Sequence, residues 1–267
     1  MVMISSKSYT FEEALNATKN FRSKEVSVSE SVAKFLYNCA KLVAGKDVIV
    51  ETGAFIGYAT IFLGFGSSTG NGVKVHSIDP WGLPPSSMES RRTYQDKLRI
   101  SRKTFDEFLQ NIKEAGLENL IIHHRAYAHT YSRVWPRNLT IGLLVIDGDH
   151  SEWGAYADYF LYSKYLADGA TVIFHDFGDG SVERAVSRID KSKIRDGLIL
   201  GTGYESREAF AFKYIKSNRK NWLEKTYYYE LSLRNRIKKT FPVTYKIIAI
   251  IPHLFKKITG KRKQFGK

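Results

Sequence analysis

Cysteine is almost absent from this sequence. Its 267 residues include a single cysteine, Cys39, so an intramolecular disulfide and a zinc site with several thiolate ligands are both excluded. No G-x-G-x-x-G dinucleotide fingerprint follows the first predicted strand. Residues 1–15 contain no long apolar run and carry acidic residues early, so we expect no secretory signal and a cytoplasmic protein.

Acidic residues are scarce in one part of the chain only. Residues 217–267 contain 14 lysines and arginines against two glutamates, a net charge of +12, whereas residues 1–216 contain 27 basic and 25 acidic residues, a net charge of +2. The overall charge of +14 therefore comes from a C-terminal tail. The charge alone does not indicate that the rest of the chain binds nucleic acid.

The sequence predicts three parts. Residues 1–45 form an N-terminal helical cap, with a capping box that Ser27 opens. Residues 46–216 form an α/β body, in which the polar, proline-bearing segment 81–102 is typical of a loop or lid over a ligand site. Residues 217–267 form a basic amphipathic helical tail.

Within the body, five apolar runs have the length and β-branched composition of buried strands. Helical patterns alternate with them, which predicts a doubly wound, mostly parallel sheet with ligands at the carboxyl ends of the strands. Two later apolar runs joined by a polar loop predict an antiparallel hairpin at one edge. The predicted strands are 48–51, 73–79, 120–124, 141–146, 170–174, 198–203 and 209–215, and the predicted helices are 104–115, 153–166 and 182–189.

The first two strands end in residues suited to a nucleoside ligand. The first runs into Glu51 and a Gly-x-x-x-Gly turn, where Gly53 and Gly57 let the backbone bend and approach a ligand. Glu51 would oppose a pyrophosphate, so it favours a cationic or hydroxyl-rich ligand. Asp79 ends the second strand, a position from which an acidic side chain binds ribose hydroxyls.

The fourth and fifth strands end in Asp147 and in the pair His175 and Asp176. Neighbouring strands lie about 4.8 Å apart, so these three side chains can converge on one divalent ion. Asp149 is a competing ligand, and a His175 that points away would leave Asp176 to bind alone. Carboxylates suit Mg²⁺, whereas an imidazole shifts the preference toward Mn²⁺, Fe²⁺ or Zn²⁺. His150 is either a general base or a cap of the following helix.

With these motifs in place, the sequence resembles the class I S-adenosylmethionine-dependent methyltransferases. It is similar to the bacterial family that includes macrocin O-methyltransferase, over roughly residues 28–215. The resemblance implies a seven-stranded Rossmann-like sheet with an antiparallel last strand, and Trp81 either covers the adenine or packs under the lid. The matching motifs are VIVETGAFIG (48–57), HSIDPW (76–81), VIDGDHSEWGAYAD (145–158), ADGATVIFHDF (167–177) and SVERAV (181–186). The expected cofactor residues are Glu51, Thr52, Gly53, Gly57, Asp79, Trp81 and Asp147.

The resemblance implies transfer of a methyl group from S-adenosyl-L-methionine to a hydroxyl of a sugar, a glycan or a small natural product. A divalent metal, Mg²⁺ or Mn²⁺, would activate the oxygen with Asp147 and His150 as the catalytic groups. One alternative is an RNA methyltransferase recruited by the tail. The Pro-Pro-aromatic motif typical of enzymes that methylate amino groups of DNA does not follow the fourth strand. Cytosine-C5 methyltransferases need a catalytic cysteine, whereas Cys39 lies in the predicted N-terminal cap. Another alternative is a non-catalytic, membrane-associated protein that binds the cofactor.

The tail suggests partners of its own. Its mainly apolar stretch 247–255 is too short to span a bilayer, and Pro252 interrupts it. Lysines flank this stretch, so the tail is suited to the anionic inner face of a membrane. Docking on the body or on the second subunit of a homodimer is the alternative, and nucleic acid is the least favoured partner.

Overall fold

The computed structural model divides the chain into two compact units, Met1–Lys220 and Asn221–Lys267. It describes residues 10–19, 28–82, 91–178, 180–201, 207–217, 224–230 and 232–233, with the backbone alone for 91–102. In the second unit, residues 224–230 are helical. Among the helices of these described segments, none has both the length and the apolar character needed to cross a bilayer.

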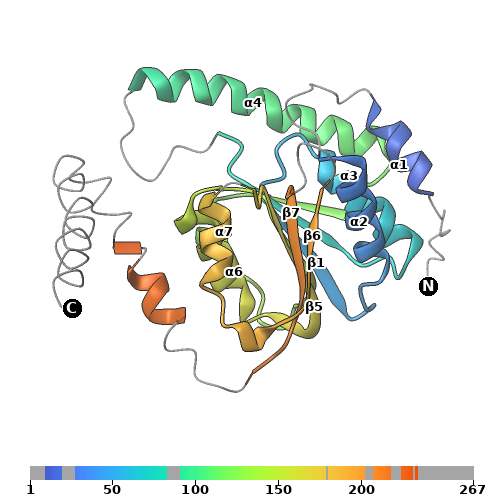
Figure 1. Cartoon of the computed structure of the whole chain (residues 1–267). Helices are drawn as coiled ribbons and strands as arrows, with labels where there is room; N and C mark the ends of the chain where they lie inside the picture. The colour runs from blue at the N-terminus through green and yellow to red at the C-terminus, as the bar shows by residue number, and fades with distance from the viewer. Residues whose placement is uncertain are drawn as a thin grey trace, which may run out of the picture. The chain divides into compact units, whose positions relative to one another are not determined.

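A seven-stranded sheet lies at the centre of the first unit (Figure 1). Its strand order is β3-β2-β1-β4-β5-β7-β6, and β7 runs antiparallel to both of its neighbours while the other pairs are parallel. This is the predicted doubly wound sheet with a reversed last strand, so the fold class is confirmed. The strands are β1 Asp47–Thr52, β2 Val75–Asp79, β3 Ile121–Arg125, β4 Thr140–Ile146, β5 Leu166–His175, β6 Ile194–Leu200 and β7 Ala209–Tyr214.

Helices cover both faces of the sheet, with α1, α2 and α3 on one side and α6 and α7 on the other (Figure 1). A short 3-10 helix, Lys191–Lys193, precedes β6. The helices are α1 Phe11–Ala17, α2 Glu30–Lys41, α3 Tyr58–Thr69, α4 Arg91–Glu114, α5 Ala128–Tyr131, α6 Glu152–Ser163 and α7 Gly180–Ser187.

Helix α4 is longer than predicted. It begins at Arg91, so the second half of the predicted loop 81–102 is helical, and residues 83–90 lie outside the described part of the chain. The reason is composition: Arg91–Glu114 contains neither glycine nor proline and is rich in the long charged residues that favour helices. The polar residues of 91–102 therefore belong to a charged helix and not to a loop, as their polarity had suggested.

The strand predicted at 198–203 is β6, which begins four residues earlier, at Ile194, and ends at Leu200. Two further predicted boundaries, those of α2 and β5, are also wrong. Helix α2 begins behind Ser29, whose hydroxyl accepts a hydrogen bond from the Val32 N–H at 3.4 Å, and the predicted cap Ser27 lies outside the described residues. Leu166, predicted as the end of a helix, is the first residue of β5. A single apolar residue between a helix and a strand fits either pattern equally well, which explains why Leu166 was assigned to the helix.

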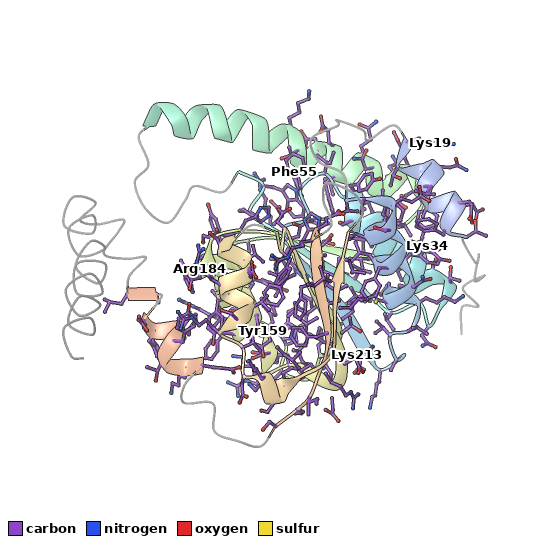
Figure 2. All side chains as sticks on the ribbon, viewed as in Figure 1. Lys19, Lys34, Phe55, Tyr159, Arg184 and Lys213 are labelled. Atoms are coloured by element: carbon purple, nitrogen blue, oxygen red, sulfur yellow. The ribbon has the colours of Figure 1, made fainter. Side chains whose placement is uncertain are left out.

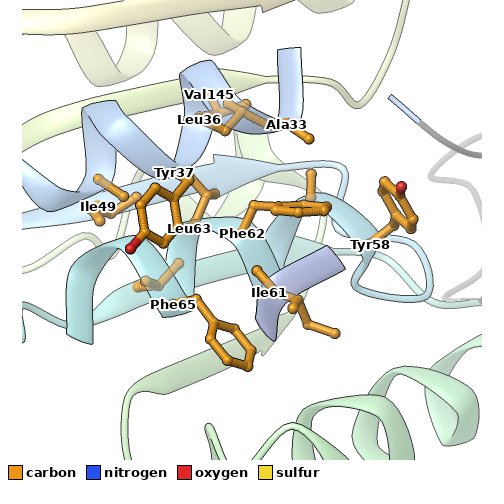
Figure 3. Packing of buried hydrophobic residues seen from close by; sticks show 14 of the residues in the cluster. Ala33, Leu36, Tyr37, Ile49, Tyr58, Ile61, Phe62, Leu63, Phe65 and Val145 are labelled. Carbon is orange, nitrogen blue, oxygen red and sulfur yellow. The ribbon is translucent and has the colours of Figure 1, made fainter. Parts of the chain in front are cut away.

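Helices α2 and α3 pack closely against each other and against β1 (Figure 3). Tyr37 and Leu36 from α2 meet Phe62 of α3 in a cluster whose members are almost fully buried. Gly66 of α3 makes this approach possible, because a Cβ there would lie 2.2 Å from the Tyr37 carbonyl oxygen. The N-terminal helices therefore share one core with the sheet.

On the other face of the sheet, α6 contributes three fully buried tyrosines, Tyr156, Tyr159 and Tyr162. Tyr159 lies in the interior between α6 and the sheet (Figure 2) and contacts Phe174 of β5 and Phe212 of β7, with ring centroids 6.1 and 6.4 Å away. This packing fixes the position of α6 relative to β5 and β7.

Gly66→Ala should destabilise the protein, because the added methyl group must push back the Tyr37 carbonyl group. We expect the free energy of unfolding to fall by about 1–3 kcal/mol, the usual cost of overpacking. Gly45→Ala is the matched control, since its nearest neighbour would be Asn71 Cβ at an ordinary 3.7 Å. Urea unfolding measures both, and equal stabilities of the two variants would contradict the packing argument.

Candidate active site

The turn after β1 brings its backbone against the end of β4. Gly53 has a φ of 87°, and a Cβ there would lie 2.1 Å from the carbonyl oxygen of Asp147. Gly57 has a φ of 90° and begins α3 without a side-chain cap. The first N–H groups of α3 are therefore left without a capping side chain, as in sites where a ligand meets a helix N-terminus.

Glu51 lies beneath this turn and is 1% exposed. One of its carboxylate oxygens accepts hydrogen bonds from the hydroxyls of Thr60 at 2.6 Å and Ser77 at 2.8 Å. The other oxygen is buried without a hydrogen-bond partner in the described structure. Burial, with smaller contributions from the charges of Asp147 and Asp79, raises the pKa of Glu51 to about 7. This oxygen therefore needs a hydrogen-bond donor or a cation, and a bound ligand can provide either.

Asp79 connects the turns after β1 and β2. Its carboxylate accepts hydrogen bonds from the backbone N–H groups of Phe55 at 3.0 Å and Trp81 at 2.8 Å. Burial raises the pKa of this carboxyl group. These two bonds fix the side chain at the carboxyl edge of the sheet, where the resemblance places the ribose.

Trp81 is buried, with 1% of its surface exposed. Its ring lies 5.0 Å from that of Phe105 and 4.6 Å from that of Phe108, both on α4, and its Nε1–H donates to the Phe55 carbonyl oxygen at 2.6 Å. Arg125, the last residue of β3, donates to the Trp81 carbonyl oxygen at 2.7 Å. The indole ring packs in the core and has almost no surface left to cover an adenine.

The structure brings together Asp147, His175 and Asp176, whose candidate ligand atoms all lie within 4.8 Å of one another. His175 Nδ1 lies 2.9 Å from Asp147 Oδ1 and 3.4 Å from Asp176 Oδ1. Nδ1 is buried, yet no hydrogen bond to it has acceptable geometry. Ligands at right angles around one ion, with bonds of about 2.1 Å, lie about 3 Å apart. The three side chains thus fit a divalent cation, and His175 does not point away.

The competing ligand, Asp149, has another role. Its carboxylate accepts a hydrogen bond from the Ser151 N–H at 2.9 Å and lies so close to Gly154 that a Cβ there would be 2.2 Å from Asp149 Cγ. Asp149 therefore shapes the turn that leads into α6. Asp176, in contrast, adopts a left-handed φ of 51°, an uncommon backbone conformation that often marks a functional site.

His150 lies at the exposed side of this cluster. Its Nδ1 is 2.7 Å from Asp176 Oδ2 and its Nε2 is 3.5 Å from Asp147 Oδ1. Hydrogen bonds to Asp147 and Asp176 raise the pKa of His150 to about 10, whereas the pKa of Asp176 is held well below its usual range. His150 does not cap α6, because the Ser151 hydroxyl accepts the Gly154 N–H at 3.0 Å. With both carboxylates ionised, this raised pKa favours the protonated imidazole at neutral pH.

Two buried carboxylates near the site were missed by the sequence analysis. Asp158 on α6 is 6% exposed, and Glu208, directly before β7, is 8% exposed. Glu208 Oε1 lies 3.3 Å from His175 Nε2. Asp158 lies inside one of the matching motifs, so its position was the only available signal, and nothing in the sequence marked Glu208.

Comparison with known proteins agrees with this geometry. Residues 50–177 match the model of a family described as a methyltransferase domain. Residues 50–177 are thus similar to a methyltransferase domain. The matched segment begins in β1 and ends just past Asp176, so it includes the turn after β1 and the cluster of Asp147, His175 and Asp176. The predicted family resemblance and enzyme class are confirmed, whereas no curated protein is similar enough to be counted as a relative.

Solved structures share the fold of the methyltransferase domain at low sequence identity. An O-methyltransferase from Bacillus cereus in complex with SAH is 19% identical, with a TM-score of 0.51 over 77% of this chain and 90% of that one. The O-methyltransferase TomG from Streptomyces achromogenes, involved in tomaymycin synthesis and in complex with SAM, is 17% identical, with a TM-score of 0.53 over 78% and 89%. A putative O-methyltransferase from Klebsiella pneumoniae is 13% identical, with a TM-score of 0.53 over 78% and 88%.

Asp158→Asn should alter how stability depends on pH. Burial raises the pKa of Asp158 from 3.8 to about 7, so the folded protein holds this proton more tightly than the unfolded chain does. The resulting stabilisation is complete below pH 3.8 and is lost as the pH rises toward 7. We therefore expect the variant to gain stability relative to the parent over this range. Urea unfolding at several pH values measures the difference.

Asp106→Asn serves as the control for this measurement, because Asp106 is exposed on α4. It should keep the pH dependence of the parent. If Asp158→Asn matches the parent as closely as this control does, Asp158 does not hold a proton in the folded state.

Proposed function

We propose that this protein is an S-adenosylmethionine-dependent O-methyltransferase that acts on a hydroxyl of a small molecule, such as a sugar, a glycan unit or a natural product, with the help of a divalent cation. The observation that carries the proposal is the cluster of Asp147, His175 and Asp176 beside the turn after β1. The cluster touches that turn directly, because Gly53 leaves no room for a Cβ against Asp147. The proposed cation site and the proposed nucleoside site are therefore adjacent, and the contact between Gly53 and Asp147 is the wall that they share.

The cofactor side of this wall suits S-adenosylmethionine. Its ribose offers two hydroxyls to Asp79, and its methionine ammonium group suits the unpaired carboxylate oxygen of Glu51. Thr52, Gly53 and Gly57 shape the backbone between these two residues. Asp147 belongs to both sites, since its backbone contacts Gly53 and its carboxylate contacts His175. Two similar structures contain SAM or SAH, which supports the assignment.

The acceptor side suits removal of a hydroxyl proton. S-adenosylmethionine supplies an activated methyl group when bound, and a divalent cation such as Mg²⁺ or Mn²⁺ lowers the pKa of a nearby hydroxyl. Asp147, His175 and Asp176 would hold that cation. His150 would take the acceptor's proton, since it borders the cluster and is 44% exposed. With a cation neutralising its two carboxylate partners, His150 would lose the interactions that now keep it protonated.

We also keep the three-part division of the chain as a proposal: cap 1–45, domain 46–216 and tail 217–267. The charge of +12 on the tail supports association with the anionic inner face of a membrane, which would suit a lipid-linked glycan acceptor. A homodimer contact through the same tail is the alternative. Recruitment of RNA is less favoured, because no feature of the described site is specific for a nucleic acid.

Substitutions on the two sides of the wall should separate cofactor binding from cation binding. Asp79→Asn should raise the Kd for S-adenosylmethionine about tenfold or more, since it removes a charged acceptor worth about 1.5–3 kcal/mol. Asp176→Asn should leave this Kd within about twofold but weaken Mn²⁺ binding. Calorimetry in EDTA measures the first constant, and electron paramagnetic resonance of free Mn²⁺ measures the second. Equal losses of cofactor affinity in both variants would refute the division of roles.

Deletion of residues 217–267 should abolish binding to anionic vesicles while leaving the affinity for S-adenosylmethionine unchanged. Each lysine or arginine near such a surface contributes about 1 kcal/mol, so the full chain should float with phosphatidylserine vesicles at low salt and not with neutral ones. Flotation of the truncated and full chains side by side measures this. Equal partitioning of the two proteins would end the membrane proposal, and a change in sedimentation alone would favour the dimer.

A further inference from the structure

The second ring nitrogen of His175 has a partner that no motif of the sequence contains. His175 Nε2 lies 3.3 Å from Oε1 of Glu208, the residue directly before β7. The Glu208 side chain is 6% exposed, so the contact is shielded from water. Since β7 pairs with β5 and Ala209 is aligned with His175, the sheet itself places the two side chains next to each other.

Glu208 is in turn held by the N-terminus of α2. Its Oε1 accepts a hydrogen bond from the backbone N–H of Ser29 at 2.7 Å. In a capping box this N–H is paired with an acidic side chain three residues further on, but Val32 occupies that position in α2. Glu208 takes over this function from a distant part of the chain. The positive end of the α2 dipole also favours a carboxylate at this place.

A histidine that binds a metal through one nitrogen usually donates the N–H of its other nitrogen to a carboxylate or a carbonyl group. That contact fixes both the tautomer and the direction of the ring. In this structure Nε2 faces Glu208, while Nδ1 faces Asp147 and Asp176 without a hydrogen bond. When Nε2–H is donated to Glu208, the lone pair is on Nδ1, the nitrogen that faces the other two candidate ligands.

We propose that Glu208 is a positioning residue, which keeps the Nε2–H tautomer of His175 and so directs its Nδ1 lone pair to the cation held by Asp147 and Asp176. The proposal rests on the function proposed above and extends it to a residue outside the matched segment 50–177. It also makes the N-terminus of α2 part of the support of the site, because Ser29 holds the carboxylate that holds the ring.

The test compares Mn²⁺ binding by the full-length parent, Glu208→Gln and Glu208→Met. Glutamine keeps an acceptor for Nε2–H and loses only the charge, whereas methionine has a similar volume and loses the acceptor as well. We expect the Kd for Mn²⁺ to rise about 10–100-fold in Glu208→Met, the usual effect of losing such a partner, and to rise less in Glu208→Gln. Electron paramagnetic resonance of free Mn²⁺ gives both constants.

Spin-echo modulation from ¹⁴N adds a signature that a general loss of stability would not produce. The parent should show coupling of Mn²⁺ to an imidazole nitrogen, His175→Asn should lose it, and Glu208→Met should weaken it while Glu208→Gln retains it. Glu183→Gln is the matched control, because it removes a carboxylate that pairs with Arg207 at 2.8 Å and does not touch His175. It should match the parent in both measurements.

The affinity for S-adenosylmethionine in EDTA should be the same in all these variants, which shows that the fold is intact. Unchanged Mn²⁺ affinity and ¹⁴N coupling in Glu208→Met would overturn the role of Glu208 and leave the proposed cation site standing. Absence of Mn²⁺ binding in the parent would overturn both. If Glu208→Met does not bind S-adenosylmethionine, Glu208→Gln decides: a Kd for Mn²⁺ above that of Glu183→Gln supports the proposal, and an equal Kd overturns it.

Discussion

The pairing of β4 with β5 is the constraint on which the candidate site depends. Ile146 is aligned with Phe174, so the next residues of the two strands, Asp147 and His175, emerge side by side at the same edge. A shift of one residue would turn His175 to the opposite face of the sheet. The buried residues of both strands prevent such a shift, because Val145 and Ile173 belong to the same core as the N-terminal helices. The chemistry at the edge thus depends on the packing below it.

This arrangement concentrates negative charge in a region with little water. The charges of Asp147 and Asp79 both raise the pKa of Glu51, and Asp147 also raises that of Asp79. Asp147 and Asp79 therefore oppose ionisation of Glu51, and a positive ligand or a proton at Glu51 relieves the repulsion. A divalent cation and the positively charged S-adenosylmethionine would both do so. The affinity that we propose for such ligands and the electrostatic cost of the site in the free protein would have the same origin.

Local periodicity was sufficient to predict the first five strands and the acidic and histidine residues at their carboxyl ends, but it placed the start of β6 four residues too late. Parallel strands align their carboxyl ends, and Asp147, His175 and Asp176 converge for this reason. Contacts between distant segments were not predictable: the burial of Trp81 depends on α4, and the contact of Glu208 with His175 depends on the return of β7. A charged helix such as α4 also resembles a polar loop when only hydrophobic spacing is considered.

The N-terminal helices are therefore more than a cover for the sheet. Helix α2 packs on α3 through Gly66, and α3 begins at Gly57, at the end of the turn after Glu51. The same helix holds Glu208 through the N–H of Ser29. A displacement of α2 would disturb the cofactor side through α3 and the cation side through Glu208. The two proposed halves of the site are thus connected through one helix, in addition to their direct contact between Gly53 and Asp147.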